Sequence, residues 1–281
     1  MRNLLAVIFI VQMFCTNAQR LINYVDPFIG TGGHGHTYPG AAAPFGLMQL
    51  SPDTRLDGWD GCSAYHYTDS IVYGFSHTHL SGTGVSDYAD LLVMPFHPAT
   101  KKQDAHGRVF SHFSHQREKA EPGYYAVELD DYQIKTEFTV TERAGIHRYH
   151  FAQNRVYLVI DLDHRDKVLD FEFDIVDNKT IRGKRISKAW AEEQHFYFYM
   201  QFSSAFKVDS TTLEGKRIYL DFGNHKDLEI RVGMSAVDVQ GAQLNLDKEI
   251  GNQSFEEIKS KTQNAWEKEL KKIVLTASGG P

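Results

Sequence analysis

The chain has 281 residues, a formal net charge of −6 at pH 7 and a pI near 6.1. This acidic balance excludes a general nucleic-acid-binding protein, which would need a basic surface over the phosphates. Hydrophobic residues make up 42% of the chain, enough for one large core or two smaller ones. Beyond the N-terminus no apolar run approaches membrane-spanning length, so we expect no membrane span.

The first 18 residues are typical of a secretory signal peptide. Arg2 gives a positive start, residues 4–14 form a short apolar run, and small residues follow for cleavage. Cleavage would remove Cys15 and leave Cys62 alone, so no internal disulfide is expected. In the alternative, Cys15 is acylated as in a lipoprotein, although the large residues before it fit that processing poorly. We expect an exported protein that is periplasmic, secreted or held at the cell surface.

Two kinds of strand pattern follow the signal. Residues 22–96 are rich in Gly, His and Tyr, and runs at 71–75 and 89–95 predict strands that flank a loop at 77–87. From residue 123 onward, apolar and polar residues alternate between turn signals, as in an antiparallel β-sandwich. These alternating runs are 125–129, 134–141, 147–151, 156–162, 181–186, 195–202, 217–222 and 228–235. The fold predicted for residues 19–252 is therefore an all-β antiparallel sandwich.

The final segment changes to a helical period. Ser254 and Glu257 have the spacing of a capping box and predict the start of a helix. The apolar stripe that follows consists of Phe255, Ile258, Ala265, Trp266, Leu270 and Ile273. We assign residues 253–281 to a linker helix and the start of a further connection, with the stripe packing either on the sandwich or on another domain.

A glycine-dense stretch at residues 28–40 matches a dinucleotide-binding spacing. Gly30, Gly32 and Gly35 satisfy G-x-G-x-x-G, and Asp53 lies about twenty residues on. That motif requires a helix whose N-terminus receives the pyrophosphate, and the prolines here leave no such helix. We therefore expect the glycines to let the backbone fold tightly beside a ligand or another domain, and we expect no nucleotide site.

Histidines form two pairs, His34 with His36 and His77 with His79, each at the i, i+2 spacing that faces one way on a strand. Four imidazoles could build a transition-metal site. No His-Glu-x-x-His motif accompanies them. The favoured interpretation is that these rings hydrogen-bond to loop backbone or to a sugar, and we assign no metal ligand.

Residues 51–67 place charged side chains and aromatic rings in one short loop. Sugars are bound by such a combination, because a ring stacks on an apolar sugar face while charged groups hold the hydroxyls. An ordinary turn, with Trp59 plugging the edge of the sandwich, explains the same residues equally well. The residues concerned are Arg55, Asp57, Trp59, Asp60, Tyr65 and Tyr67.

Several uncommon strings occur in order over about seventy residues. They are YVDPFIGT at 24–31, HGHTYPGA at 34–41, QLSPD at 49–53, GFSHTHLSGTG at 74–84 and DLLVMP at 90–95. In this combination the chain strongly resembles the N-terminal domain of glycoside hydrolase family 92, whose members are exo-acting, calcium-dependent, inverting α-mannosidases.

The resemblance implies a galactose mutarotase-like β-sandwich joined by a helical linker to an (α/α)₆ catalytic barrel. It implies that the catalytic acid, the catalytic base and most Ca²⁺ ligands belong to the barrel, so we assign this chain no catalytic residue and no metal. We expect the barrel to be absent here, or separately encoded as a partner, and the chain to be inactive alone.

The substrate expected from the resemblance is a mannose-containing glycan, which the sandwich loops would contact from one side. A stand-alone carbohydrate-binding module and an unrelated structural or adhesion domain are the alternatives. The residues assigned to sugar contact are Arg55, Trp59, Asp60, His77, His79, Gly82 and Asp87.

Overall fold

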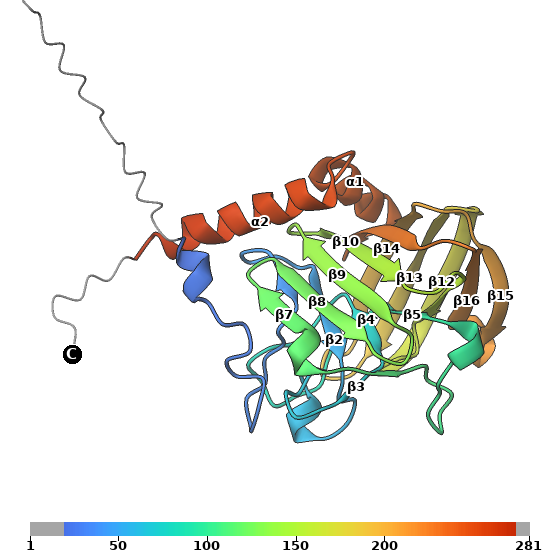
Figure 1. The fold of residues 1–281 in the computed structure, drawn as a ribbon, viewed down its shortest axis with the longest axis horizontal. Helices are drawn as coiled ribbons and strands as arrows, with labels where there is room; N and C mark the ends of the chain where they lie inside the picture. The colour runs from blue at the N-terminus through green and yellow to red at the C-terminus, as the bar shows by residue number, and fades with distance from the viewer. Residues whose placement is uncertain (1–19, 274–281) are drawn as a thin grey trace, which may run out of the picture.

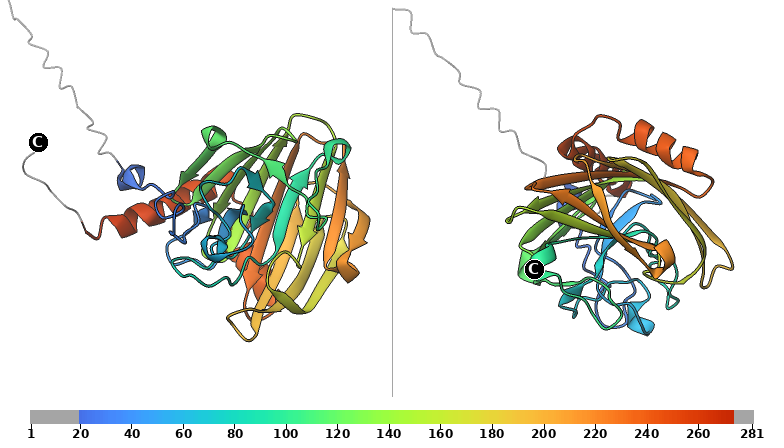
Figure 2. Two further views of the ribbon diagram at one scale, coloured as in Figure 1. Left: turned by 90° about the horizontal axis from the view of Figure 1, so that it is seen from below. Right: turned by 90° about the vertical axis from the view of Figure 1, so that its right-hand side faces the viewer.

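The computed structural model describes residues 20–273, so the predicted signal peptide lies outside the described residues. Two large antiparallel sheets face each other (Figures 1 and 2). The first has seven strands, in the order β1 (Ala41–Ala42), β2 (Gln49–Asp53), β4 (Gly74–Ser76), β5 (Leu92–Phe96), β11 (Val156–Asp161), β16 (Arg217–Gly223) and β15 (Lys207–Thr212).

The second sheet has eight strands and supplies the other layer. Its order is β12 (Lys167–Asp177), β13 (Thr180–Lys188), β14 (Gln194–Phe202), β17 (Asp227–Ser235), β10 (Ala144–Phe151), β9 (Ile134–Val140), β8 (Tyr124–Leu129) and β7 (Glu118–Glu121). A small third sheet pairs β3 (Ile71–Val72) with β6 (Ser111–His112). Short 3-10 turns cover Leu21–Tyr24, Trp59–Gly61, Pro98–Thr100, His115–Arg117 and Leu213–Gly215.

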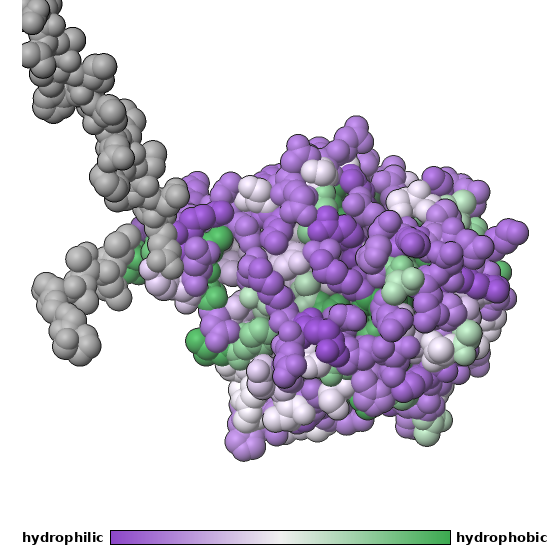
Figure 3. Space-filling view, viewed as in Figure 1, coloured by the Kyte–Doolittle hydropathy of each residue, from purple (hydrophilic) through white to green (hydrophobic). Residues whose placement is uncertain are grey.

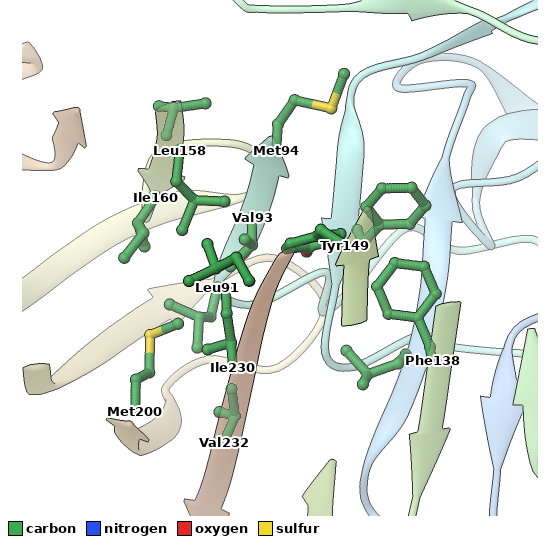
Figure 4. Packing of buried hydrophobic residues seen from close by; sticks show 14 of the residues in the cluster. Leu91, Val93, Met94, Phe138, Tyr149, Leu158, Ile160, Met200, Ile230 and Val232 are labelled. Atoms are coloured by element: carbon green, nitrogen blue, oxygen red, sulfur yellow. The ribbon is translucent and has the colours of Figure 1, made fainter. Parts of the chain in front are cut away.

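The main core fills the space between the two large sheets. Val93 and Ile160 come from the seven-stranded sheet and meet Phe138 and Ile230 from the eight-stranded one, all of them fully buried (Figure 4). Alternation along each strand produces this arrangement, because successive side chains point to opposite faces. The predicted antiparallel β-sandwich is confirmed.

Two helices cover the outer face of the eight-stranded sheet, α1 (Val239–Glu249) and α2 (Phe255–Leu270) (Figures 1 and 2). A second core joins them to the sheet, with Leu246 and Ile258 packing over Ile146. The predicted capping box is present, since Ser254 and Glu257 each bond the other's backbone N–H. Because Ile258 packs over the sheet, α2 folds back on the sandwich. The sequence did not predict α1.

Some strand boundaries differ from the prediction. Residues 71–75 were expected to form one strand, but they divide at Tyr73 between β3 and β4, which belong to different sheets. Edge strands β12 and β15 were missed because their side chains are largely exposed and lack a clean apolar face. Among residues 20–273, no helix is long and apolar enough to cross a membrane.

A chain of buried hydrogen bonds crosses the core between the sheets. His77 and His147 are fully buried, and their Nε2 atoms lie 3.1 Å apart. His77 Nδ1 lies 2.6 Å from Leu91 O and must donate to it, so its Nε2 accepts from His147. Tyr149 OH, 2.7 Å from His147 Nδ1, then donates to that nitrogen. Each ring is neutral in this network, and a further proton on either would break it.

Burial lowers the pKa of His77 from 6.5 to about 3 and holds the pKa of His147 well below its usual value. The unfolded chain takes up these protons near pH 6.5, but the folded chain does not. The free energy of unfolding should therefore fall as pH drops from 6.5 toward about 3, by up to about 1.4 kcal/mol per pH unit for each histidine.

His147→Gln tests this contribution, because the amide can accept from Tyr149 and donate to His77 without titrating. Between pH 7 and pH 5, the free energy of unfolding, measured with urea, should fall less for this variant than for the parent chain. An identical pH dependence in both proteins would contradict the assigned proton arrangement.

Candidate functional site

Two long loops that follow strands of the seven-stranded sheet contact each other. The Trp59 loop (residues 54–70) connects β2 to β3, and the His77 loop (residues 77–91) connects β4 to β5. β2 and β4 are antiparallel neighbours, with Asp53 opposite Gly74 and Ser51 opposite Ser76, so the two loops leave opposite ends of this short strand pair. The glycine-rich segment 30–38 lies against the Trp59 loop, where Ser63 Oγ donates to Thr37 O at 3.1 Å.

Trp59 is the exposed aromatic of this region. It begins a 3-10 turn after Gly58, whose positive φ of 80° suits glycine, and 62% of its surface is exposed. The indole rests on the His77 loop at Gly84, where an added Cβ would come within 2.0 Å of the ring. His36 contacts it edge-on, with ring centroids 5.1 Å apart. Trp59 therefore presents a supported flat surface to solvent.

Asp60, the next residue in the chain, adds a charged group beside Trp59. Asp60 Oδ1 lies 2.9 Å from Nδ1 of the exposed His34 ring and 3.8 Å from Nε2 of His36. The hydrogen bond with His34 lowers the pKa of Asp60, so this residue is a carboxylate at neutral pH and accepts hydrogen bonds. An aromatic face beside charged hydrogen-bonding groups is the chemistry that holds a sugar ring.

The two loops are fastened together from behind by Arg165, in the turn between β11 and β12. Its Nη2 donates to Gly61 O at 2.6 Å, and its Nε donates to Ser86 Oγ at 2.7 Å. The buried thiol of Cys62 adds a third link through Thr83 O at 2.7 Å. These contacts hold the Trp59 loop and the His77 loop as one unit.

Three other residues were predicted to contact the sugar, and each lies in a different environment from Trp59 and Asp60. Arg55 turns away from Asp60 and pairs with Asp69, with its Nε 3.2 Å from both carboxylate oxygens. Asp87 is buried and accepts from Ala191 N at 3.1 Å. Gly82 is exposed with a φ of 76°, and no atom lies within 4 Å of the position that a Cβ would take, which permits a close approach from that side.

His77 and His79 lie inside the protein, so the expectation that their rings face a sugar needs correction. His77 belongs to the buried network of the core. His79 lies between Gln49 O, 2.9 Å from its Nδ1, and Asp53 Oδ1, 2.8 Å from its Nε2. The i, i+2 spacing predicted that both rings face one way on a strand, but β4 ends at Ser76 and the two rings have different partners.

Asp53 is the centre of a buried polar cluster beneath the loops. Its carboxylate accepts from Ser76 Oγ at 2.9 Å and lies 2.6 Å from His164 Nε2, in addition to the contact with His79. Burial by itself would raise the pKa of Asp53, but the hydrogen bonds with His164 and His79 outweigh it and hold the pKa below its usual range. The group therefore stays ionised within the protein.

Sequence reasoning missed Arg165 and its neighbour Asp166. The pattern of residues 161–170 indicates only a hairpin end, and no spacing signal relates Arg165 to Gly61, 104 positions away. Asp166 has a positive φ of 59°, and burial raises its pKa to about 6. Such groups are recognisable only after the fold brings distant segments together.

No group of three or more His, Cys, Asp or Glu side chains suited to a metal ion occurs among residues 20–273. The four histidines considered for a transition metal divide into an exposed ring, His34, and three buried ones.

The structural class is an antiparallel β-sandwich whose loops carry groups that can bind a sugar. Comparisons with known proteins identify the family. A model of the "Glycosyl hydrolase family 92 N-terminal domain" matches residues 24–235. The chain belongs to glycoside hydrolase family 92, and the matched part is its N-terminal domain.

Solved structures support the same assignment. The family GH92 α-mannosidase BT3965 from Bacteroides thetaiotaomicron, in complex with mannoimidazole, is 34% identical with a TM-score of 0.82, over 92% of this chain and 38% of that one. The family GH92 inverting mannosidase BT2199 of the same organism is 26% identical with a TM-score of 0.76, over 93% and 37%.

A curated relative from Arthroderma benhamiae, named an uncharacterized secreted glycosidase, is 27% identical over 92% of this chain and 39% of its own length. The chain thus spans less than two fifths of the relatives it matches.

Gly84→Ala tests the support of Trp59. The new methyl group would overlap the indole, so we expect the Trp59 indole N–H signal to move in NMR spectra. The free energy of unfolding should change by only about 1 kcal/mol, because the ring is exposed and can move. Gly32→Ala is the control, since its added Cβ would meet only Tyr67 Cβ, at an ordinary contact distance of 3.7 Å. An unmoved Trp59 signal in Gly84→Ala would show that the ring does not rest there.

Proposed function

We propose that this chain is the carbohydrate-facing N-terminal domain of an exported, inverting α-mannosidase that acts on the terminal α-mannosides of N-glycans. Trp59 carries the proposal, because an exposed indole supported from behind and flanked by a carboxylate suits a pyranose ring. In this role Trp59 stacks on an apolar sugar face, Asp60 accepts from hydroxyls, and Gly82 allows close approach. Arg55 and Asp87 position the loops.

Hydrolysis with inversion needs a general acid and a general base on opposite sides of the bond, with room for a water. In the proposal these carboxyl groups and the Ca²⁺ belong to a separate (α/α)₆ catalytic domain. The described residues supply the other wall of the substrate pocket. A stand-alone carbohydrate-binding module remains the second candidate, because it would use the same Trp59 surface.

The purified chain should release no mannose from α-1,2-mannobiose, with or without added calcium, because it contributes no acid–base pair. Product detection by chromatography checks this outcome. Calcium-dependent turnover by this chain alone would contradict the proposed division of labour.

Binding is tested by calorimetric titration of the full chain with α-1,2-mannobiose at millimolar sugar. Trp59→Ala should abolish the heat of binding, since stacking supplies most of the contact. Phe45→Ala is the matched control, because Phe45 is 91% exposed but lies outside both loops. Heat that survives in Trp59→Ala, or no heat from the parent chain, would exclude the Trp59 surface as a sugar site in this chain.

A further inference from the structure

A pocket of about 520 Å³ lies between the turn joining β13 to β14, the end of β17 and Tyr88 of the His77 loop. Its volume falls in the roughly 300–1,000 Å³ range of small-molecule sites. No residue of the Trp59 loop lines it. The pocket is therefore separate from the Trp59 surface, and a ligand could occupy either one without the other.

Part of the pocket wall is apolar. Phe196 and Met234 are almost fully buried and close its inner side, while Leu47 is 46% exposed. Such a surface can receive the C–H face of a sugar ring, and methionine adapts its shape to the ligand.

Two amides give the pocket complementary hydrogen-bonding groups. Gln194 Nε2 donates to Asp90 Oδ2, and Gln194 Oε1 is buried with no hydrogen-bond partner among the described residues. Gln49 Oε1 accepts from His79 N at 2.7 Å, which leaves the Gln49 Nε2 group free to donate. Both side chains line the pocket. One unpaired acceptor and one donor are the kinds of group that hydrogen-bond to the hydroxyls of a sugar.

The acceptor is held in place by a buried ion pair. Asp90 pairs with Arg185, both of them buried, and it also accepts from Thr78 Oγ1 at 2.8 Å. The backbone beside it is strained, with positive φ values of 77° at Tyr88 and 55° at Leu91. Gln194 is thereby oriented before any ligand arrives, which lowers the cost of binding.

The pocket lining offers no lysine or arginine to an anion. Glu193 lies on the lining, where its carboxylate is 3.1 Å from His195 Nε2, and Asp90 lies behind Gln194. We propose that this pocket binds a neutral pyranose unit, as a second carbohydrate site distinct from the Trp59 surface.

The test uses the full chain labelled with ¹³C at its methionine methyl groups and titrated with methyl α-D-mannopyranoside. The Met234 signal should shift with sugar concentration and saturate. Ala236→Trp fills the pocket from an exposed rim position and should weaken this response by roughly tenfold or more. Val237→Trp is the matched control, since Val237 is 76% exposed and does not line the pocket.

Gln194→Leu removes the amide, both its unpaired acceptor and its donor to Asp90, without adding a methionine signal, and should weaken the response to a similar extent. If that variant loses its fold, the Ala236→Trp comparison still decides. Trp59→Ala should leave the Met234 shift intact, so failure of the Trp59 surface and failure of this pocket are distinguishable. A Met234 signal that never moves, that moves equally in Ala236→Trp, or that responds as strongly to glucuronate would overturn the proposal.

Discussion

A buried carboxylate, Asp53, lies at the start of the Trp59 loop and is hydrogen-bonded to the His77 loop. It ends β2, where the Trp59 loop begins, and its partners come from β4, the His77 loop and the turn after β11. An ionised group without water must keep all its partners, because removing one leaves a buried charge uncompensated. This requirement links three distant segments and forces His79 inward.

The same turn that supplies His164 also supplies Arg165, which fastens the Trp59 loop to the His77 loop. A second buried charge pair, Asp90 with Arg185, ties the end of the His77 loop to β13. Two rigid polar clusters thus support the two proposed sugar surfaces from behind. On the face shown in Figure 3, hydrophobic surface gathers near the end of α2, where Val25, Trp266 and Leu270 line a smaller pocket.

Periodicity predicted much of the sandwich, because strands such as 134–140 bury one face and alternate accordingly. It failed where burial is incomplete, as in β12 and β15, and at α1, whose buried face contains only Ala242 and Leu246. Trp59 was identified from loop chemistry and Gly82 through the family resemblance, and both are exposed. The roles of His77 and Arg165 depend on partners 70 and 104 positions away, and no local pattern encodes such partners.

Hydrogen exchange of Asp53→Asn tests most directly whether this buried carboxylate organises both loops. Asparagine keeps the shape but brings an amide where His79, His164 and Ser76 require an acceptor. We predict that amides in residues 54–70 and 77–91 lose protection while β13 and β14 keep theirs. Unchanged protection in the loops, or equal loss across the whole sandwich, would contradict this account.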